Sequence, residues 1–134
     1  MNEITVLVID EHQDIRSLLS RGLDGIPPLH VVASTGSPLE GEALAARWQP
    51  DVILIDLKVR GRYRAEVYQG IGRASPRSRL IVFTSYLTDG EEKESLESGV
   101  SRCLLKGMPL KNLAAEIVKS LEAQPALNRD KLRN

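Results

Sequence analysis

Residues suited to phosphoryl chemistry directly follow several apolar segments of the chain. Asp10 and Glu11 come after the first apolar run, and Asp56 comes after another. The hydroxyl of Thr84 and the amine of Lys106 stand in the same position after two further runs. Carboxylates brought together repel one another, and a small hard cation such as Mg²⁺ relieves that repulsion. A carboxylate held beside such an ion can act as a nucleophile and form an aspartyl phosphate, the role that we assign to Asp56.

The charges of this group favour a site that contains both a metal ion and Lys106. Mg²⁺ and Lys106 together balance the three carboxylates before transfer. After transfer, the site carries about one excess negative charge, compared with about four if both cations are missing. Thr84 can then donate its hydroxyl to a phosphoryl oxygen, a hydrogen bond that forms only in the product.

The segments that position these residues have the pattern of a parallel sheet. The runs at 4–9, 52–55 and 80–83 are continuous, apolar and rich in Val and Ile, which is typical of central strands buried on both faces. The runs at 30–34 and 102–105 are shorter and have polar ends, as expected of edge strands. Polar residues after such strands meet at the carboxyl edge of the sheet.

Helical stretches separate these runs, and they begin and end at ordinary helix signals such as Ser37-Pro38 and Gly25. We expect helices at about 15–23, 38–49, 65–73, 91–98 and 109–121. The fourth stretch is mostly charged, and Leu96 is its only large apolar residue. Five strands alternating with five helices predict a doubly wound α/β fold with crossovers of one hand.

Composition narrows the class of protein further. The chain has 134 residues, 42% of them hydrophobic, with 18 basic and 18 acidic residues and a net charge of +0. That balance argues against a dedicated nucleic-acid binder. A single cysteine excludes an internal disulfide framework, and no apolar run approaches the ~18 residues of a membrane span. We expect a cytoplasmic protein without a membrane partner, with one domain at 1–122 and a polar extension or linker at 123–134.

The ordered set of acids, hydroxyl and lysine closely resembles the receiver domain of two-component response regulators. The flanking sequences are similar too: Val-Leu-Val-Ile-Asp-Glu-His at 6–12, Pro-Asp-Val-Ile-Leu-Ile-Asp at 50–56, and Cys-Leu-Leu-Lys at 103–106. Gly-Val-Ser at 99–101 and Lys-Gly-Met-Pro at 106–109 resemble the subgroup whose receivers precede helix-turn-helix output domains.

This resemblance implies a role for each residue of the site. Asp56 would accept a phosphoryl group from a sensor histidine kinase or a phosphotransfer protein. Glu11 would bind Mg²⁺ directly and Asp10 largely through water, while Asp56 and the backbone carbonyl of Lys58 would supply further ligands. The protein would be a signalling switch rather than an enzyme, with only self-phosphorylation and self-dephosphorylation as its own chemistry.

The resemblance covers residues 4–122 and also implies the fold and the output. It implies a flavodoxin-like sheet with strand order 2-1-3-4-5. Thr84 would turn toward the new phosphoryl group and Lys106 would pair with it. The surface of the fourth helix, fifth strand and fifth helix would then change its preference for a partner or a second copy of the chain. DNA would be contacted only through an output domain that is not present in this chain.

Departures from the family pattern keep two other interpretations open. Glu11 stands where an Asp is common, the stretch at 59–64 lacks the usual Met-Pro-Gly and Asp-Gly, and Cys103 replaces a switching Tyr or Phe. Tyr86, close to Thr84, is an alternative aromatic residue. These departures favour a pseudo-receiver, an interaction module that works without phosphate. A haloacid-dehalogenase-type phosphatase is the third interpretation, although that family has Asp-x-Asp where this chain has Asp-Glu-His.

Overall fold

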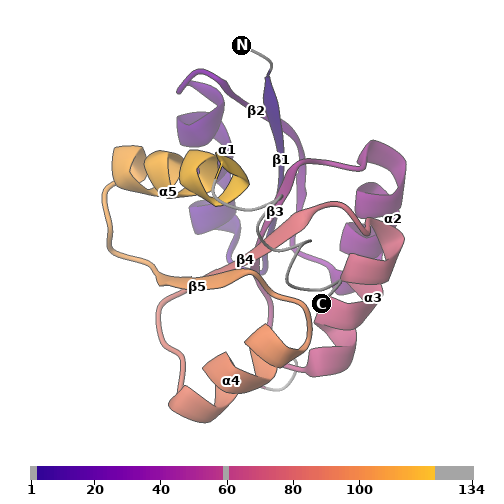
Figure 1. Ribbon diagram of the computed structural model, residues 1–134. Helices are drawn as coiled ribbons and strands as arrows, with labels where there is room; N and C mark the ends of the chain where they lie inside the picture. Colours follow the sequence, from indigo (N-terminus) through magenta and orange to yellow (C-terminus); the bar gives the residue numbers. More distant parts are fainter. Residues whose placement is uncertain (1–2, 59–60, 123–134) are drawn as a thin grey trace.

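The computed structural model describes residues 3–58 and 61–122. It consists of a five-stranded parallel sheet that lies between two layers of helices (Figure 1). The strands are β1 (Ile4–Asp10), β2 (Leu29–Thr35), β3 (Val52–Asp56), β4 (Arg79–Thr84) and β5 (Arg102–Leu105). The helices are α1 (Gln13–Asp24), α2 (Pro38–Trp48), α3 (Ala65–Ala74), α4 (Asp89–Glu97) and α5 (Leu110–Glu122). The extension predicted at 123–134 lies outside the described residues.

The strand order is β2-β1-β3-β4-β5, and every neighbouring pair is parallel. This order confirms the predicted doubly wound sheet and places β2 and β5 at its edges. The central strands are buried over nearly their whole length, which explains their continuous apolar sequences. Among the residues that the structure describes, no helix is both long and apolar enough to cross a membrane.

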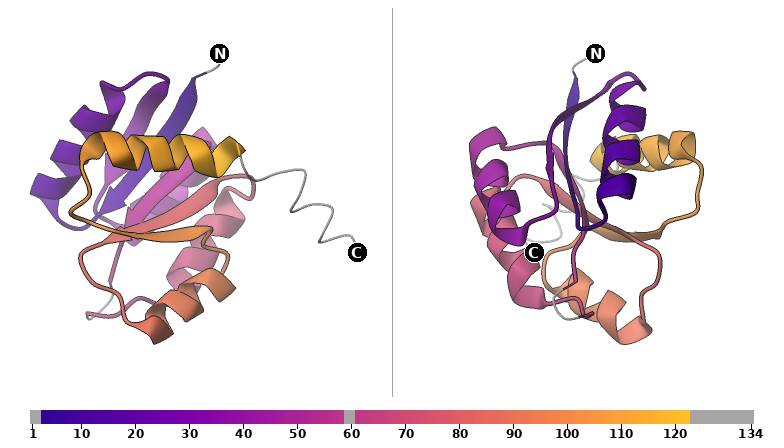
Figure 2. Two further views of the ribbon diagram at one scale, coloured as in Figure 1. Left: turned by 60° about the vertical axis from the view of Figure 1, so that its left-hand side comes forward. Right: turned by 180° about the vertical axis from the view of Figure 1, so that it is seen from behind.

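Alternate residues of the central strands point to opposite faces of the sheet, and each face has its own hydrophobic core. On one face, Val8 of β1 packs with Leu23 of α1 and Ile117 of α5. On the other, Ile53 of β3 packs with residues of α2 and α3, including Tyr68. Figure 2 shows the two layers, with α1 and α5 on one side of the sheet and α2 and α3 on the other.

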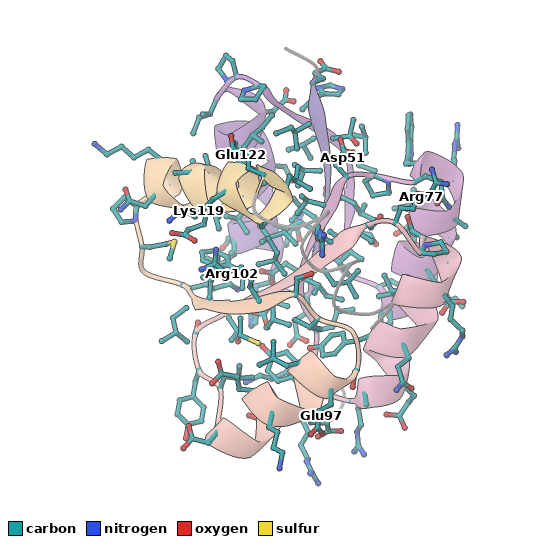
Figure 3. The ribbon with its side chains drawn as sticks, in the orientation of Figure 1. Asp51, Arg77, Glu97, Arg102, Lys119 and Glu122 are labelled. Atoms are coloured by element: carbon teal, nitrogen blue, oxygen red, sulfur yellow. The ribbon has the colours of Figure 1, made fainter. Side chains whose placement is uncertain are left out.

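Polar contacts fix the ends and edges of the sheet. At its amino edge, the Thr5 backbone N–H donates to Asp51 Oδ2 at 2.9 Å, and the Asp51 N–H donates to Thr5 Oγ1 at 3.0 Å. On the β5 side, Arg102 pairs with Glu116 of α5, and Lys119 Nζ forms a second, longer ion pair with Glu116 at 3.7 Å. Figure 3 labels Asp51, Arg102 and Lys119 among the side chains. These contacts hold β3 against β1 and α5 against β5, away from the carboxyl edge.

Helix α4 is the least embedded of the helices. It begins with a capping box, in which Thr88 Oγ1 accepts from the Glu91 N–H and Glu91 Oε1 accepts from the Thr88 N–H, each at 3.0 Å. This cap explains why the helix starts at Asp89, two residues before the predicted start. Its one buried residue is Ser95, and Leu96 is 44% exposed. The expectation of a helix with little apolar packing is therefore confirmed.

Candidate functional site

The site is assembled at the carboxyl edge of the sheet by the register of β1 against β3. Asp10 pairs with Asp56 as the last residue pair of the two strands. The Glu11 backbone N–H extends this contact by donating to the Asp56 carbonyl at 3.4 Å. Both carboxylates are buried, with 2% of Asp10 and 5% of Asp56 exposed. Two carboxylates so close together and so far from water need positive charge beside them.

Lys106 supplies that charge. Its Nζ donates to Asp10 Oδ2 at 2.8 Å and to Asp56 Oδ2 at 2.7 Å. The backbone positions it, because the Lys106 N–H donates to the Thr84 carbonyl at 2.7 Å, directly beyond β5. Burial acts to lower the pKa of Lys106, but the hydrogen bonds and charges of the two carboxylates outweigh it, and the net pKa is raised. The lysine is therefore held in its charged form between the two acids.

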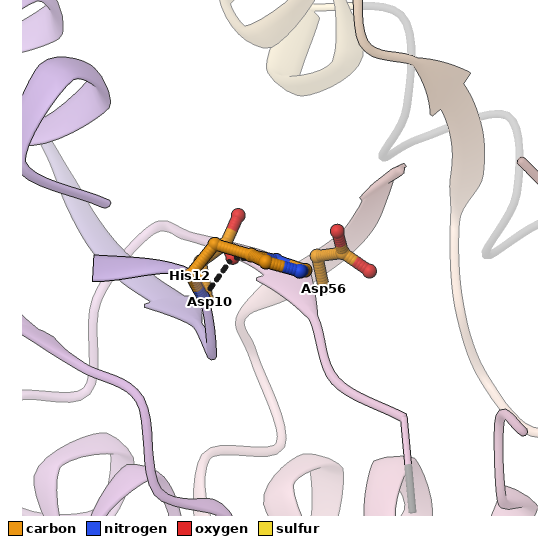
Figure 4. Close-up of side chains that lie close together, drawn as sticks. All are labelled: Asp10, His12 and Asp56. Atoms are coloured by element: carbon orange, nitrogen blue, oxygen red, sulfur yellow. Dashed lines mark hydrogen bonds and ion pairs between the residues drawn. The ribbon is translucent and has the colours of Figure 1, made fainter. Parts of the chain in front are cut away.

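Asp10 is also bonded to His12, a residue that was not predicted to belong to the site. The His12 backbone N–H donates to Asp10 Oδ1 at 2.9 Å, and the ring Nδ1 lies 3.2 Å from the same oxygen. Ligand atoms of Asp10, His12 and Asp56 lie within 4.8 Å of one another (Figure 4). The only indication of this contact in the sequence is that His12 comes two residues after Asp10, the acid that ends β1.

Glu11, predicted to bind the metal directly, lies at the side of this group. Its carboxylate Oε1 accepts from the Lys58 backbone N–H at 3.1 Å, and the residue is exposed. Within the described part of the chain, the set of three close ligand residues contains His12 in place of Glu11. The metal roles of Glu11 and of the Lys58 carbonyl stay predictions.

Thr84 ends β4 and is buried beside the site. Its hydroxyl donates to the Tyr86 carbonyl at 3.4 Å, which is a long contact for a hydrogen bond between oxygens. The same hydroxyl also interacts with the phenol of Tyr63, so it lies beside a group that is bonded to Asp56. Tyr86 itself is exposed, so its ring does not pack under Thr84.

Tyr63 is the second residue of the site that sequence reasoning did not assign. Its hydroxyl donates to Asp56 Oδ1 at 2.6 Å, and only 4% of the residue is exposed. The ring packs against Tyr68 at 5.7 Å between centroids, and Lys58 Nζ lies 5.2 Å from the ring centre. Burial, followed by the hydrogen bond to Asp56, raises the pKa of Tyr63. The phenol therefore keeps its proton and acts as a donor at neutral pH.

The sequence carried one indirect signal for Tyr63, which is the departure of the stretch 59–64 from the family pattern. Val59 and Arg60, in the same stretch, lie outside the described residues. Cys103, another departure, lies in β5 and is partly buried. Burial, with a smaller contribution from the charge of Glu92, raises the pKa of its thiol to about 11. Cys103 is therefore a protonated packing residue rather than a nucleophile.

The donor atoms present fit a small divalent cation. The carboxylates of Asp10 and Asp56 converge from adjacent strand ends, and Lys106 balances only one of their two charges. A cation that prefers oxygen ligands, as Mg²⁺ does, suits two carboxylates that converge at the carboxyl edge of the sheet. The residues that would hold it are Asp10 and Asp56.

Comparison with known sequences identifies the family. Residues 6–118 match the response regulator receiver domain, and the chain belongs to this family of signalling proteins. The predicted resemblance is thereby confirmed. The interpretation as a haloacid-dehalogenase-type phosphatase is set aside, because that is a different family.

Curated relatives cover nearly the whole of this chain. The transcriptional regulatory protein LiaR of Bacillus subtilis (strain 168) is 32% identical over 124 residues, which are 92% of this chain and 59% of that protein. The response regulator protein VraR of Staphylococcus aureus (strain Mu3 / ATCC 700698) is 28% identical over 134 residues, 98% of this chain and 64% of that protein. The chain thus spans about three fifths of the length of these relatives.

Solved structures agree on the fold. The receiver domain of the putative response regulator NarL from Mycobacterium tuberculosis superposes with a TM-score of 0.82 at 19% identity, covering 92% of this chain and all of that one. A CheY-like receiver domain protein from Methanospirillum hungatei JF-1 gives 0.80 at 19% identity, covering 91% and 96% of the two chains. A DNA-binding response regulator of the LuxR family from Staphylococcus aureus gives 0.77 at 18% identity, covering 87% and 97%.

Proposed function

We propose that this chain is a phosphorylation-dependent receiver that accepts a phosphoryl group on Asp56 from a sensor histidine kinase or a phosphotransfer protein. One observation carries the proposal. Asp56 ends a buried central strand beside Asp10, with Lys106 Nζ 2.7 Å from its carboxylate. This arrangement holds one carboxylate at the carboxyl edge of the sheet, next to the positive charge that a phosphorylated product needs.

The transfer is a displacement at phosphorus. A carboxylate oxygen of Asp56 attacks, and the new O–P bond forms as the P–N bond of a phosphohistidine breaks. The leaving imidazole keeps the electron pair of that bond and takes up a proton. Lys106 stays beside the acceptor throughout and offsets the charge that the phosphoryl oxygens bring to the site.

Asp10 and Asp56 would hold the divalent cation in this proposal, with Glu11 and the Lys58 carbonyl as the remaining predicted ligands. Mg²⁺, when bound, supplies charge neutralisation and orients the incoming phosphoryl group. Lys106 alone leaves the pair of buried carboxylates one negative charge in excess. Removal of Mg²⁺ by a chelator is therefore expected to stop phosphorylation.

The signal would leave the site through α4, β5 and α5. Thr84 turns from the Tyr86 carbonyl to the phosphoryl group, and Lys106 pairs with it. Large apolar side chains stand exposed on this surface and beside it, among them Leu96 and Leu105. Because α4 has little buried apolar area, a small differential free energy is enough to shift it.

The partner of that surface would be an output module or a second copy of the chain. The relatives named as transcriptional or DNA-binding regulators support an output that acts on DNA. We assign residues 1–122 to the receiver and 123–134 to a polar extension or linker.

A second candidate is a pseudo-receiver that binds its partner without phosphate. The contact of Tyr63 with Asp56 favours it, because the carboxylate already has a donor on each oxygen. Cys103, in place of the switching aromatic of the family, also favours it. Phosphorylation of the isolated chain separates the two candidates.

The test uses acetyl phosphate and MgCl₂ with intact-mass analysis. The wild-type chain is expected to gain the mass of one phosphoryl group, and Asp56→Asn is expected to gain none. Asp51→Asn is the matched control, because Asp51 precedes the same strand at the opposite edge of the sheet and should leave labelling intact. Equal labelling of wild type and Asp56→Asn would contradict Asp56 as the acceptor. A chain that is never labelled, even after the Tyr63 hydroxyl bonded to Asp56 is removed, would favour the pseudo-receiver.

A further inference from the structure

The Tyr63 hydroxyl occupies the side of Asp56 on which a phosphoryl group would have to be. Oδ2 of Asp56 faces Lys106, while Oδ1 accepts the Tyr63 hydroxyl at 2.6 Å. Lys106 Nζ is shared between Asp56 Oδ2 and Asp10 Oδ2, so Oδ2 faces the pair of acids and the lysine. Oδ1 is then the oxygen left for a phosphoryl group. The Tyr63 hydroxyl and the phosphoryl group therefore exclude each other.

We propose that Tyr63 is the switching aromatic residue of this receiver, a phenol that blocks Asp56 Oδ1 in the unphosphorylated state and is displaced when the phosphoryl group binds. The proposal rests on the proposed function of Asp56. In this chain Cys103 stands where the family often has the switching Tyr or Phe. The proposal assigns that switching role to Tyr63, which lies on the loop between β3 and α3.

The contact also restrains the reaction before it starts. A hydrogen bond donated to the attacking oxygen holds one of its lone pairs and lowers its nucleophilicity, and the phenol fills the approach to that oxygen. An incoming phosphodonor must first displace a side chain that is almost fully buried. The free chain is therefore expected to be phosphorylated slowly by small donors.

Displacement of Tyr63 would carry the signal to α4. The ring packs on Tyr68 and lies near Lys58 Nζ, and both contacts are lost when it moves. The charge of Lys58 and the backbone N–H of Tyr63 both act on the Glu91 carboxylate, part of the capping box of α4. A change at Asp56 thus reaches the first turn of α4 through Tyr63 and its neighbours.

The first test compares initial rates of phosphorylation by acetyl phosphate at saturating MgCl₂. Tyr63→Phe keeps the ring but removes the hydroxyl. We expect this variant to be phosphorylated at least about tenfold faster than wild type, because a hydrogen bond to a charged group is lost. Tyr68→Phe is the matched control. Tyr68 is also buried, but its hydroxyl donates to the Leu57 carbonyl at 3.1 Å, and its rate should stay within about twofold of wild type.

Each outcome of this comparison decides something. Wild type that labels as fast as Tyr63→Phe, or faster, overturns the role of Tyr63 while leaving Asp56 as the acceptor. Labelling of Tyr63→Phe alone supports both proposals. Labelling of neither protein overturns both. Far-UV circular dichroism of each variant shows whether a slow rate comes from loss of the fold.

A second test needs no variant for its main readout. The chain contains three tyrosines, so 3-fluorotyrosine gives three fluorine resonances, which Tyr63→Phe and Tyr68→Phe assign. On addition of MgCl₂ and beryllofluoride, the Tyr63 resonance is expected to move and to acquire the solvent isotope shift of an exposed ring, while that of Tyr68 keeps its buried character. A Tyr63 resonance that stays buried when beryllofluoride is bound would overturn the displacement.

Discussion

Each oxygen of the Asp56 carboxylate has its own donor, Tyr63 on Oδ1 and Lys106 on Oδ2. The two donors differ in what they do to the acceptor. The positive charge of Lys106 stabilises the phosphorylated product more than the free carboxylate, because phosphorylation brings further negative charge to the site. Tyr63 is neutral and occupies space, so it stabilises the unmodified carboxylate alone. The balance between them sets how readily Asp56 reacts.

Cys103 provides a prediction of pH dependence at the residue scale. Its pKa is raised to about 11 because burial disfavours the thiolate. We expect its alkylation by iodoacetamide to be slow at pH 8 and to increase until the pH nears 11. In guanidinium chloride the same thiol should titrate near 8.5, the value of an unperturbed cysteine. The measurement is clean because the chain has a single cysteine.

The direction of the linked effect on stability follows from this raised pKa. Below the unfolded pKa of about 8.5, the protonated thiol contributes its full stabilisation to the folded state. Between there and about 11 the unfolded chain loses its proton first, and that contribution is lost as the pH rises. A folded-state alkylation profile with its midpoint near 8.5 would contradict the burial of Cys103.

Some residues of the site could be predicted from the sequence, and others could not. Asp10, Asp56 and Lys106 could be placed together from the sequence, because each directly follows an apolar strand and parallel strands bring such positions to one edge. Tyr63 and His12 could not, because both lie in loops, where no hydrophobic periodicity specifies the path of the chain. A side chain that reaches a strand end from a loop becomes visible only in three dimensions.

At the scale of elements, the strands were predicted more accurately than the helix ends. The predicted fifth strand, 102–105, coincides with β5, since a short apolar run between polar residues leaves little choice of register. The start of α4 differed from the prediction because Thr88 and Glu91 form a capping box, and the charged sequence gave no apolar marker for the first turn. Capping chemistry, rather than periodicity, determines where this helix begins.

That cap yields a prediction for α4. We expect Thr88→Ala to cost about 1 kcal/mol of helix stability and to speed amide hydrogen exchange in α4 by about fivefold. Exchange in α5 should be unchanged, because α5 is anchored by buried residues such as Leu113 and Ile117. Hydrogen exchange monitored by mass spectrometry gives the comparison.

Ser37→Ala is the matched control for this experiment. The Ser37 hydroxyl accepts from the Glu40 N–H at 3.1 Å at the start of α2, so its removal should speed exchange there and leave α4 as in the wild type. Thr88→Ala that leaves exchange in α4 unchanged, or that speeds exchange throughout the molecule, would contradict the view of α4 as a locally stabilised and weakly packed helix.

At the scale of the whole molecule, the cation site joins the two central strands and should therefore be linked to global stability. A ligand that binds only the folded state adds about 1.4 kcal/mol when its concentration is ten times its dissociation constant. We expect MgCl₂ to raise the thermal midpoint of the wild-type chain in a saturable way. Asp10→Asn should lose this response, because it removes one of the two buried carboxylates.

Asp14→Asn is the control for that measurement. Asp14 is an exposed acid in the first turn of α1, close in sequence to the site but outside the group of three ligand residues. It should keep the full response to MgCl₂. A response that persists in Asp10→Asn would show that the ion acts elsewhere on the surface.

The central claim is that Asp56 carries the phosphoryl group, and chemical mapping of the acyl phosphate tests it most directly. Borohydride reduces an aspartyl phosphate to homoserine, and peptide sequencing by mass spectrometry then finds the position of the new residue. After treatment with acetyl phosphate and MgCl₂, we predict homoserine at position 56, with Asp10 and Asp51 unchanged. Homoserine at another aspartate, with Asp56 intact in a labelled chain, would contradict the account.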